Sequence, residues 1–329
     1  MAHIRTAQGT VGLTAAQYGQ FMVAQYAPLP TFRFAQYFSD YRREHVLSEL
    51  TAALKRDMDD ISCAYIDHQE KLYDLLPLMP HVVLKKDHLY TDEDLKLKAH
   101  LQQLIASQQY PFLTQWFAEM ATAFSNRYGL YDTPTELLQA ANGKAMLDVG
   151  GYIGDTITVF RSILPTAELY SFEPDRQNFQ ALQDNIARME GSERIHAYNC
   201  GVGATTGKLK LHHSSFGTSA GTMLNVPLST DDEEVDIITL DDFVAEHKLQ
   251  VGLIKVDVEG FEPEVIQGTL ETIKSQKPIL VIAVYHSAKE YYELKPFLES
   301  LNLGYSFRLR RSCFCNPLCE LVLVALPNH

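Results

Sequence analysis

The chain has 329 residues, of which 28 are Lys or Arg and 41 are Asp or Glu, so its net charge is −13. This length suggests about two domains, and the hydrophobic fraction of 46% argues against a mostly disordered chain. The acidic balance argues against a protein that grips nucleic acid phosphates or binds anionic membranes by charge. No apolar run approaches the roughly 20 residues that cross a bilayer, and the N-terminus lacks the apolar core of an export signal. The five scattered cysteines favour reduced thiols and a cytoplasmic location.

The first 142 residues are predicted to be mostly helical, without a strong strand. Residues 1–30 are rich in Ala, Gln and small polar residues, which indicates a loosely held arm or a short helix. Residues 47–65 carry apolar side chains at spacings of three and four and predict one amphipathic helix. Residues 91–94 predict a capped helix start. At 133–136 the threonine is predicted as the cap, the proline as the first helical residue and the glutamate as the partner that closes a capping box.

From residue 143 onward, short apolar runs alternate with segments of helical period. The strand-like runs are 145–149, 168–172, 195–198, 253–256 and 279–284, and the helical segments are 157–164, 179–189, 265–273 and 291–301. This alternation predicts an α/β fold with a parallel sheet covered on both faces. The runs 305–310 and 320–326 have no helix between them and predict an antiparallel hairpin at one edge. We therefore expect a helical region over 1–142 and an α/β domain over 143–329.

The first strand of the α/β domain leads into a glycine-rich loop. Glycines let the backbone approach a ligand closely, and the N-terminus of the following helix presents free N–H groups and partial positive charge. The spacing D-x-G-x-x-x-G differs from the G-x-G-x-x-G of dinucleotide-binding loops. The candidate cofactor residues here are Asp148, Gly150, Gly151, Tyr152, Gly154, Asp155 and Thr156.

An acidic residue ends the second strand. Glu173 lies 25 residues after Asp148, where a carboxylate can accept both hydroxyl groups of a ribose. The two features together favour a ligand with a ribose and no pyrophosphate, such as S-adenosylmethionine (SAM), with its cationic part near Asp148 and the glycine loop. Asn199, Gly201 and Val202 follow the third strand and are expected to border the adenine.

The fourth strand carries the most specific motif of the chain. Its segment Lys255-Val256-Asp257-Val258-Glu259-Gly260-Phe261-Glu262 resembles the lysine-x-aspartate-x-glutamate-glycine-x-glutamate segment of the FkbM family of SAM-dependent methyltransferases. The resemblance extends from about residue 143 to the end. It implies a class I methyltransferase fold, a Rossmann-like, doubly wound sheet of seven strands in the order 3-2-1-4-5-7-6 with the last strand antiparallel. It also implies O-methylation of a sugar, glycolipid or polyketide hydroxyl.

Three residues near strand ends are candidates for the chemistry of methyl transfer to a hydroxyl group. An alcohol acceptor needs a base, a metal ion or both, and ligands bind at the carboxyl ends of parallel strands. Asp257 and Glu259 follow the fourth strand, and His286 follows the fifth. Asp257 is also expected to face the cationic cofactor. We expect Asp257 or His286 to help remove the proton, while Asp257 with Glu259 could instead hold Mg²⁺. Ser287 and Glu290 are predicted to form a capping box next to this histidine.

The sequence leaves alternatives open for the function, for the N-terminal region and for several side chains. A NAD(P)-dependent oxidoreductase and a non-catalytic, methyltransferase-like binding protein are the rival functions. The N-terminal region is expected to cover the acceptor site or to form a subunit contact in a homo-oligomer. The loop 216–222 is expected to line the site or to be a hairpin tip. Cys313, Cys315 and Cys319 are interpreted as plain thiols rather than a zinc site, and Arg308 and Arg310 as a solvated strand face. The expected partner is a small hydroxyl acceptor, with no nucleic acid and no membrane insertion.

Overall fold

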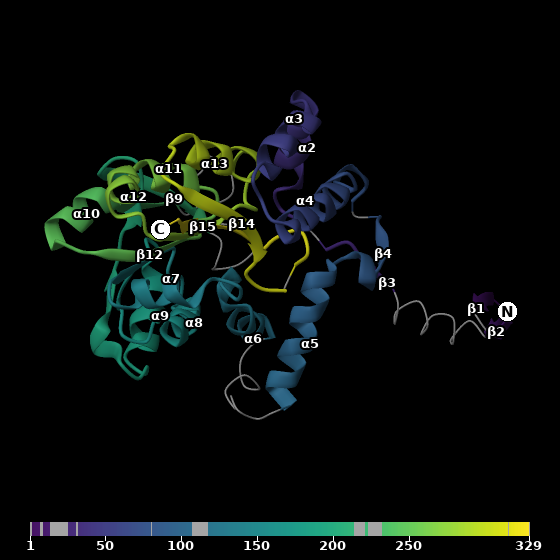
Figure 1. The fold of residues 1–329 in the computed structure, drawn as a ribbon, viewed down its shortest axis with the longest axis horizontal. Helices are drawn as coiled ribbons and strands as arrows, with labels where there is room; N and C mark the ends of the chain where they lie inside the picture. The colour runs from purple at the N-terminus through teal and green to yellow at the C-terminus, as the bar shows by residue number, and fades with distance from the viewer. Residues whose placement is uncertain are drawn as a thin grey trace.

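A seven-stranded sheet built by residues after 143 forms the centre of the molecule (Figure 1). The computed structural model describes residues 2–6, 9–13, 26–30, 32–79, 81–106, 118–213, 221–222, 232–314 and 316–328. The strands of this sheet are β5 (Ala145–Val149), β6 (Glu168–Phe172), β7 (Ile195–Tyr198), β12 (Val251–Val256), β13 (Ile279–Ala283), β14 (Tyr305–Arg311) and β15 (Leu321–Pro327). Their order along the sheet is β7-β6-β5-β12-β13-β15-β14, and β15 runs antiparallel to both of its neighbours. The predicted order 3-2-1-4-5-7-6 and the edge hairpin are therefore confirmed.

Helices cover both faces of the sheet, because alternate side chains of each strand point to opposite sides. In β13, Leu280 and Ile282 belong to one hydrophobic cluster, whereas Ile279 and Val281 belong to the other. The first cluster lies under the helices α10 (Leu240–His247), α11 (Glu262–Gln267), α12 (Leu270–Gln276) and α13 (Ala288–Ser300). The second lies under α7 (Thr135–Asn142), α8 (Asp155–Ile163) and α9 (Arg176–Ile186).

The N-terminal region packs directly onto this domain. Its elements are β1 (Ala2–Thr6), β2 (Gly9–Leu13), β3 (Tyr26–Pro28), α2 (Ala35–Glu44), α3 (Leu47–Lys55), α4 (Asp60–Tyr73), η1 (Leu76–Leu78), β4 (Val83–Lys85), η2 (Lys86–His88), α5 (Asp92–Ala106), α6 (Ala118–Ser125) and the 3₁₀-helix η4 (Arg127–Gly129). Helices α2 and α3 contact α13, and α4 contacts β14. Phe38 and Tyr73 lie with their ring centroids 4.5 Å apart, and Tyr73 meets Tyr291 of α13 at 5.4 Å. The division at residue 142 stays a prediction, but the hydrophobic core crosses it.

Several predicted elements before residue 143 differ from the structure. Where the first 30 residues are described, they form short strands rather than a helix: β1 pairs antiparallel with β2, and β3 with β4. The single helix expected over 47–65 is two helices, because Asp57 takes a left-handed backbone (φ 54°) and Asp59 caps a new helix that begins at Asp60 by accepting the N–H of Ser62. The predicted cap at Thr133 is wrong, since Pro134 is extended (ψ 132°) and the helix begins one residue later. The capped start at 91–94 is confirmed by reciprocal hydrogen bonds between Thr91 and Asp94.

Two further differences lie in the α/β domain. The helix expected over 265–273 is broken into α11 and α12 at Gly268, where a Cβ atom would lie 2.0 Å from the carbonyl oxygen of Gly203. A small second sheet, which the sequence did not indicate, follows the third strand. It consists of β8 (Gly201–Val202), β9 (Gly207–His213), β10 (Gly221–Thr222) and β11 (Asp232–Ile238), and the 3₁₀-helix η5 (Ser192–Arg194) precedes β7. The predicted capping box of Ser287 and Glu290 at the start of α13 is confirmed.

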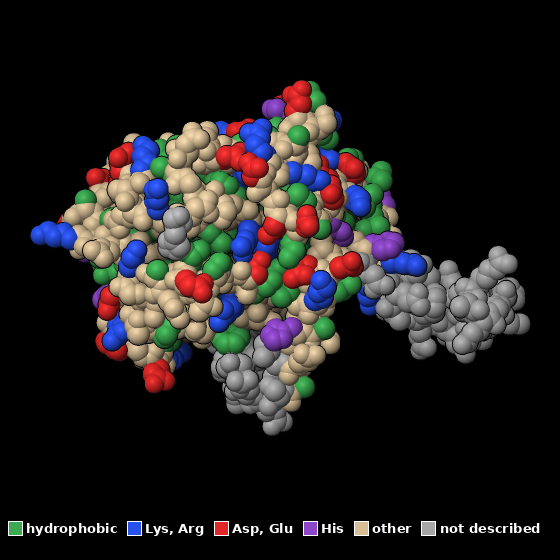
Figure 2. All heavy atoms as spheres, in the orientation of Figure 1, with side chains coloured by type: hydrophobic (Ala, Val, Ile, Leu, Met, Phe, Trp, Pro, Cys, Tyr) green, Lys and Arg blue, Asp and Glu red, His purple; other side chains and the backbone are tan. Residues whose placement is uncertain are grey.

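Charged side chains of both signs are interspersed on the face of the molecule that Figure 2 shows. The excess of acidic residues therefore does not gather there in a single patch. No helix in the described part of the chain is long and apolar enough to span a membrane. Cys63 and Cys200 are free cysteines, and Cys315 lies outside the described residues.

Ion pairs attach the N-terminal helices to strand β14. The expectation that Arg310 faces solvent is wrong: its side chain is fully buried, and its Nη2 lies 2.5 Å from both Asp59 and Asp132. The Arg308 side chain remains 25% exposed. Arg308 lies 3.4 Å from Asp132 and 3.8 Å from Asp59. The two arginines do share one strand face, as their spacing indicates, but helix α4 and the segment before α7 cover that face. The sequence alone does not indicate what covers a strand face.

Arg311, on the opposite face of β14, makes the most deeply buried of these contacts. Its Nε lies 3.0 Å from Asp94 at the start of α5, and neither side chain is exposed. The Asp94 carboxylate also accepts hydrogen bonds from the hydroxyl of Tyr65 at 2.8 Å and from the backbone N–H of Thr91 at 3.0 Å. A buried pair of this kind costs desolvation, so loss of one partner leaves the other charge uncompensated.

We predict that Asp94→Asn lowers the free energy of unfolding by about 3–5 kcal/mol, because Arg311 would then carry a buried charge without a carboxylate partner. Urea denaturation of the purified protein measures this quantity. Asp92→Asn is the matched control, since this exposed aspartate lies in the same first helical turn and its loss should cost less than about 1 kcal/mol. Equal effects of the two substitutions would contradict the prediction.

Candidate active site

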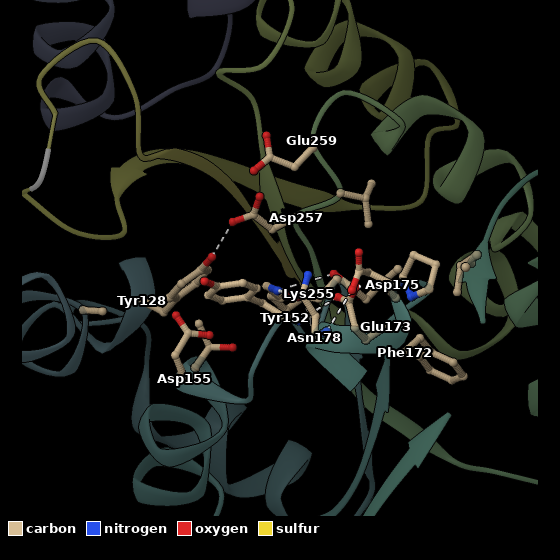
Figure 3. A pocket seen from close by; sticks show the side chains of 18 of the residues that line it. Tyr128, Tyr152, Asp155, Phe172, Glu173, Asp175, Asn178, Lys255, Asp257 and Glu259 are labelled. Carbon is tan, nitrogen blue, oxygen red and sulfur yellow. Dashed lines mark hydrogen bonds between the residues drawn. The ribbon is translucent and has the colours of Figure 1, made fainter. Parts of the chain in front are cut away.

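A cavity of about 380 Å³ opens at the carboxyl ends of β5, β6 and β12 (Figure 3). Residues of η4, of the start of α8 and of the β14–β15 hairpin also line it. Its lining includes six acidic residues and one basic residue, namely Asp155, Glu173, Asp175, Asp257, Glu259, Glu320 and Lys255. A strongly acidic cavity favours a ligand that carries positive charge.

A buried lysine connects the glycine loop to the fourth strand. Lys255 is 2% exposed, and its ammonium group donates to the carbonyl oxygen of Gly150 at 2.6 Å and lies 3.1 Å from Asp148. Burial disfavours the ammonium, but Asp148, Asp257 and Asp155 outweigh it and raise the pKa of Lys255. Asp148, predicted to face the cofactor, is fully buried and does not line the cavity. Its carboxylate pairs with Lys255 instead of facing the cavity.

The glycines of this loop are required by the close approach of protein backbones. At Gly150, which has φ +83°, a Cβ atom would lie 1.8 Å from the carbonyl oxygen of Asp257. At Gly151 it would lie 2.1 Å from the hydroxyl oxygen of Ser171. Gly154, also at positive φ, precedes helix α8. Of the three glycines only Gly150 lines the cavity, so the loop brings two strand ends together and leaves little glycine surface for a ligand.

Glu173 lines the cavity at the end of β6 and is nearly buried. Its two carboxylate oxygens accept the backbone N–H groups of Tyr152 at 2.8 Å and Asp175 at 3.0 Å. Burial raises the pKa of Glu173 to about 7, and these hydrogen bonds oppose the rise. Asn199 does not line the cavity; its amide donates to the carbonyl oxygens of Glu173 and Pro174 and so fixes the turn that presents the carboxylate.

The start of helix α8 contributes a carboxyl and a hydroxyl group. Burial raises the pKa of Asp155 to about 6, with Lys255 opposing the rise and Asp148 adding to it. The hydroxyl of Thr156 is buried and has no hydrogen-bond partner among the residues that the structure describes. Both residues line the cavity, as do Tyr152, Gly201 and Val202. A buried hydroxyl without a partner, such as that of Thr156, and a carboxyl group with a raised pKa, such as that of Asp155, are both typical of ligand-binding sites.

Asp257 stands at the opposite side of the cavity, among two phenols and an imidazole. Tyr128 donates its hydroxyl hydrogen to the carboxylate at 2.7 Å, and the Tyr285 hydroxyl lies 3.4 Å from it. His286 Nε2 is 3.5 Å from the same group. Tyr128 takes a left-handed backbone (φ 52°, ψ 42°), which costs about 1–2 kcal/mol for a non-glycine residue. Burial raises the pKa of Tyr128, so its phenol stays protonated and donates.

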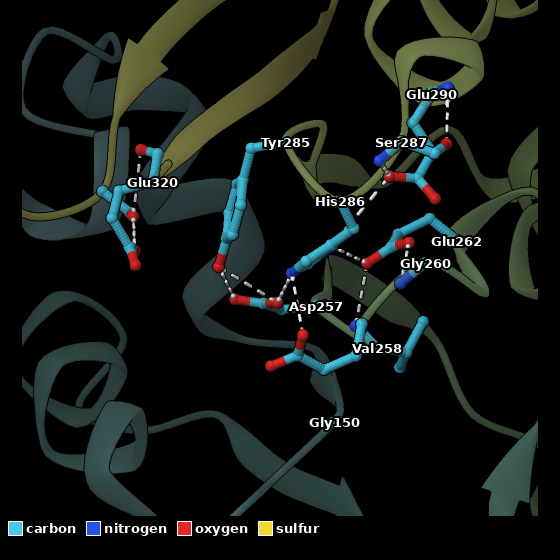
Figure 4. Close-up of polar contacts among 12 residues, drawn as sticks. Gly150, Asp257, Val258, Gly260, Glu262, Tyr285, His286, Ser287, Glu290 and Glu320 are labelled. Atoms are coloured by element: carbon cyan, nitrogen blue, oxygen red, sulfur yellow. Dashed lines mark hydrogen bonds and ion pairs between the residues drawn. The ribbon is translucent and has the colours of Figure 1, made fainter. Parts of the chain in front are cut away.

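His286 is 1% exposed and surrounded by carboxyl groups (Figure 4). Its Nδ1 lies 2.9 Å from Glu262, and its Nε2 lies 3.5 Å from both Asp257 and Glu259. Burial disfavours the imidazolium, but Glu262, Glu259 and Asp257 outweigh it and raise the pKa of His286 to about 10. Glu262 is anchored by the N–H groups of Val258 and Gly260. At neutral pH the histidine is a cation, which cannot accept a proton.

Glu259 lies in the loop after β12 with its side chain 27% exposed to the cavity side. Its backbone is left-handed (φ 58°), and its carboxylate pairs with Arg33 of the N-terminal region. Burial raises the pKa of Glu259 to about 7, while His286 and Arg33 oppose the rise and Asp257 adds to it. A carboxyl group that titrates near neutrality and is partly accessible suits general base catalysis.

A metal ion does not fit the donor set at this place. The ligand atoms of Asp257, Glu262 and His286 lie within 4.8 Å of one another. However, His286 faces three carboxylates and would have to lose its proton to bind a metal ion, because metal-binding histidine is neutral. Glu262 is already committed to two backbone N–H groups and to His286. We therefore assign no metal to this site.

Sequence reasoning missed several residues of the cavity wall. Tyr128 and Arg33 come from the N-terminal half, and no local motif marks either of them. Tyr285 is the neighbour of the predicted His286, but alternation along a strand would have placed it on the other face. Lys255 belongs to the quoted motif, although its role was not foreseen. Apart from Gly221 and Thr222, the loop 216–222 lies outside the described residues.

Comparisons with known proteins find methyltransferases. Residues 148–307 match the family model of the methyltransferase FkbM domain. The chain is 23% identical over 232 residues to Methyltransferase 1 of Beauveria bassiana, covering 64% of this chain and 92% of that protein. It is 26% identical over 181 residues to the 2-O-methyltransferase NoeI of Sinorhizobium fredii, covering 50% of this chain and 72% of that protein.

The solved structure of a methyltransferase FkbM from Methylobacillus flagellatus KT is similar to this chain with a TM-score of 0.46 and 21% identity. The match covers 71% of this chain and 60% of that one, so this chain spans less than two thirds of that solved protein. The family match favours methyl transfer over the oxidoreductase alternative. The family match therefore identifies residues 148–307 as a methyltransferase FkbM domain.

Proposed function

We propose that the protein transfers a methyl group from SAM to a hydroxyl group of a small, polyhydroxylated acceptor such as a sugar or a glycosylated compound. The observation that carries this proposal is the acidic cavity at the ends of β5, β6 and β12. SAM supplies a methyl group on a positively charged sulfur, and a cavity with six acidic residues and one lysine suits that charge. The name of the relative NoeI, a 2-O-methyltransferase, supports an oxygen acceptor.

Glu173 is proposed to bind the ribose of SAM. Its carboxyl group ends β6, lines the cavity and is held by two backbone N–H groups. An ionised carboxylate can accept two ribose hydroxyls, whereas the protonated form cannot accept both equally well. Thr156 and Asp155 offer further polar contacts to the same ligand.

We predict that Glu173→Gln weakens SAM binding about 10- to 100-fold, the loss expected for a charged hydrogen-bonding group. Because the pKa of Glu173 is raised to about 7, the group is mainly protonated below pH 6, so wild-type affinity should rise as pH increases through 7. Titration calorimetry from pH 5.5 to 8.5 measures both effects. Glu168→Gln, at the opposite end of β6, is the control, and a Glu173→Gln protein that binds like this control would refute the assignment.

Glu259 is the residue we assign as the general base. His286 is protonated at neutral pH and cannot take up the proton. Asp257 already accepts the hydroxyl hydrogen of Tyr128 at 2.7 Å, and the hydroxyl of Tyr285 lies 3.4 Å from it, so phenols occupy its carboxylate. Glu259 is accessible and titrates near neutrality. Asp257, with Tyr128, is then left to orient the acceptor hydroxyl.

We expect Glu259→Gln to lower kcat/KM by about 10²–10⁴, the usual contribution of a general base. In the wild type, kcat/KM should increase with pH through about 7, because Glu259 must lose its own proton before it can accept one. The glutamine variant should lack this rise while still binding SAM. Methylation rates between pH 5.5 and 9.5 provide the measurement, with the exposed Glu271→Gln as control. A Glu259→Gln enzyme with the wild-type rate and pH profile would exclude this role.

The acceptor is expected to lack negative charge. In Figure 3, Tyr128, Asp257 and Glu259 lie on the side of the cavity away from Glu173 and Phe172, which leaves the former side for the acceptor. That side carries carboxyl groups and phenols, whose oxygens suit hydroxyl groups. Lys255, the one basic residue among the described lining, is occupied by the glycine loop. The undescribed segments 107–117, 214–220 and 223–231 contain no Lys or Arg.

The corresponding prediction concerns glycosides that differ only at carbon 6, as a hydroxymethyl, an aminomethyl or a carboxylate group. Across a panel of sugar scaffolds, the carboxylate form should have a kcat/KM at least about tenfold below the neutral form, because like charges in a confined site repel. Release of S-adenosylhomocysteine measures turnover. A carboxylate form that reacts faster than its neutral counterpart would be incompatible with the proposed acceptor class.

A further inference from the structure

A short segment of the N-terminal region reaches the loop that carries the proposed base. Residues 32–34 precede helix α2 and are anchored on both sides. Upstream, the Leu29 N–H group donates to the carbonyl oxygen of Val82 at 2.9 Å. Phe32 is buried, with its ring 5.2 Å from Phe38 and 6.0 Å from Tyr73. The two residues that follow Phe32 are thus held at a defined place beside the site.

Arg33 and Phe34 each contact one residue of the site. The Arg33 guanidinium pairs with the Glu259 carboxylate, and its central carbon lies 4.5 Å from the centroid of the Phe34 ring. The Phe34 ring in turn meets His286 edge to face at 5.5 Å. A guanidinium packed over an aromatic ring loses part of its freedom, so its charge is kept next to Glu259.

We propose that Arg33 is a positioning residue of the methyl-transfer reaction, whose guanidinium aims the Glu259 carboxylate and stabilises its negative charge. The N-terminal region therefore completes the active site of the methyltransferase domain. This inference rests on the proposed role of Glu259 as the base. Arg33 acts through Glu259 and does not line the cavity itself.

The charges around Glu259 show how Arg33 affects the ionisation of its carboxyl group. Asp257 in the same loop and Glu262 in α11 oppose the negative charge, whereas His286 and Arg33 favour it. The phenol of Tyr285 also faces this group. His286 is shared with Glu262 at 2.9 Å and with Asp257 at 3.5 Å. By contrast, among the described residues the carboxylate that pairs with Arg33 is that of Glu259. Loss of Arg33 should therefore raise the pKa of Glu259 above its value of about 7.

The experiment compares Arg33→Gln and Arg33→Lys with the wild type from pH 5.5 to 9.5. Loss of an adjacent opposite charge should move the rise in kcat/KM by about one pH unit to the alkaline side, which lowers kcat/KM about fivefold at pH 7 and hardly at all above pH 9. Arg33→Lys retains a cation and should keep the wild-type profile. Arg43→Gln in α2 is the matched control, because that arginine is exposed and pairs with Asp40.

Two outcomes would overturn the inference. An Arg33→Gln profile identical to the wild type would show that Arg33 does not influence the base. A uniform loss at every pH, with the midpoint unchanged, would indicate a structural contact alone. SAM affinity and the melting temperature, both expected to match the wild type, verify that the variants are folded.

The same experiment separates this inference from the proposed function. If Glu259→Gln keeps the wild-type rate and profile, the assignment of the base fails, and the Arg33 inference fails with it. If Glu259→Gln is impaired but Arg33→Gln behaves as the wild type, only the Arg33 inference fails. In the double variant, Arg33→Gln should add no further loss to Glu259→Gln, since a positioning residue has no effect once its target is removed.

Discussion

One buried ammonium group joins the two strand ends on which the site depends. Lys255 of β12 reaches across to the glycine loop after β5 and binds both its backbone, at Gly150, and the carboxylate of Asp148. Removing a charge from water is costly, and the contact is tolerable only because a carboxylate and carbonyl oxygens surround it. The close approach of Gly150 to the Asp257 carbonyl oxygen follows from the same contact between strands. The position of Asp257 is therefore tied to that of the glycine loop.

The loop after β12 separates its acidic residues into two layers. Glu262 points inward, where it binds backbone N–H groups and His286. Asp257 and Glu259 line the cavity. The imidazolium of His286 lies between the layers and faces all three carboxylates. Without this cation, three negative charges would repel one another in a region with little water. His286 thus makes the acidic motif compatible with a folded loop.

The N-terminal region and the methyltransferase domain share both core and site. Tyr128 supplies the shortest hydrogen bond to Asp257, and Arg33 pairs with Glu259. The buried pairs of Arg310 and Arg311 attach the helices that precede residue 143 to the outer strand of the sheet. A methyltransferase domain without this region would lack two of the polar contacts around its carboxylates. This shared construction explains why a boundary drawn by composition at residue 142 does not separate two independent cores.

The sequence patterns by themselves determined the alternation of strands and helices, the edge hairpin and the strand ends where Glu173 and Asp257 lie, because short apolar runs and helical periods are local features. The order of the strands followed from the resemblance to the FkbM family. It also located the acidic motif. Only the tertiary structure decided which acidic residues face the cavity, as the burial of Asp148 shows. It likewise decided that His286 is a cation, since its charge depends on carboxylates brought in from α11 and β12. Contacts such as that of Arg33 with Glu259 join residues 226 positions apart, and no local pattern encodes a contact over that distance.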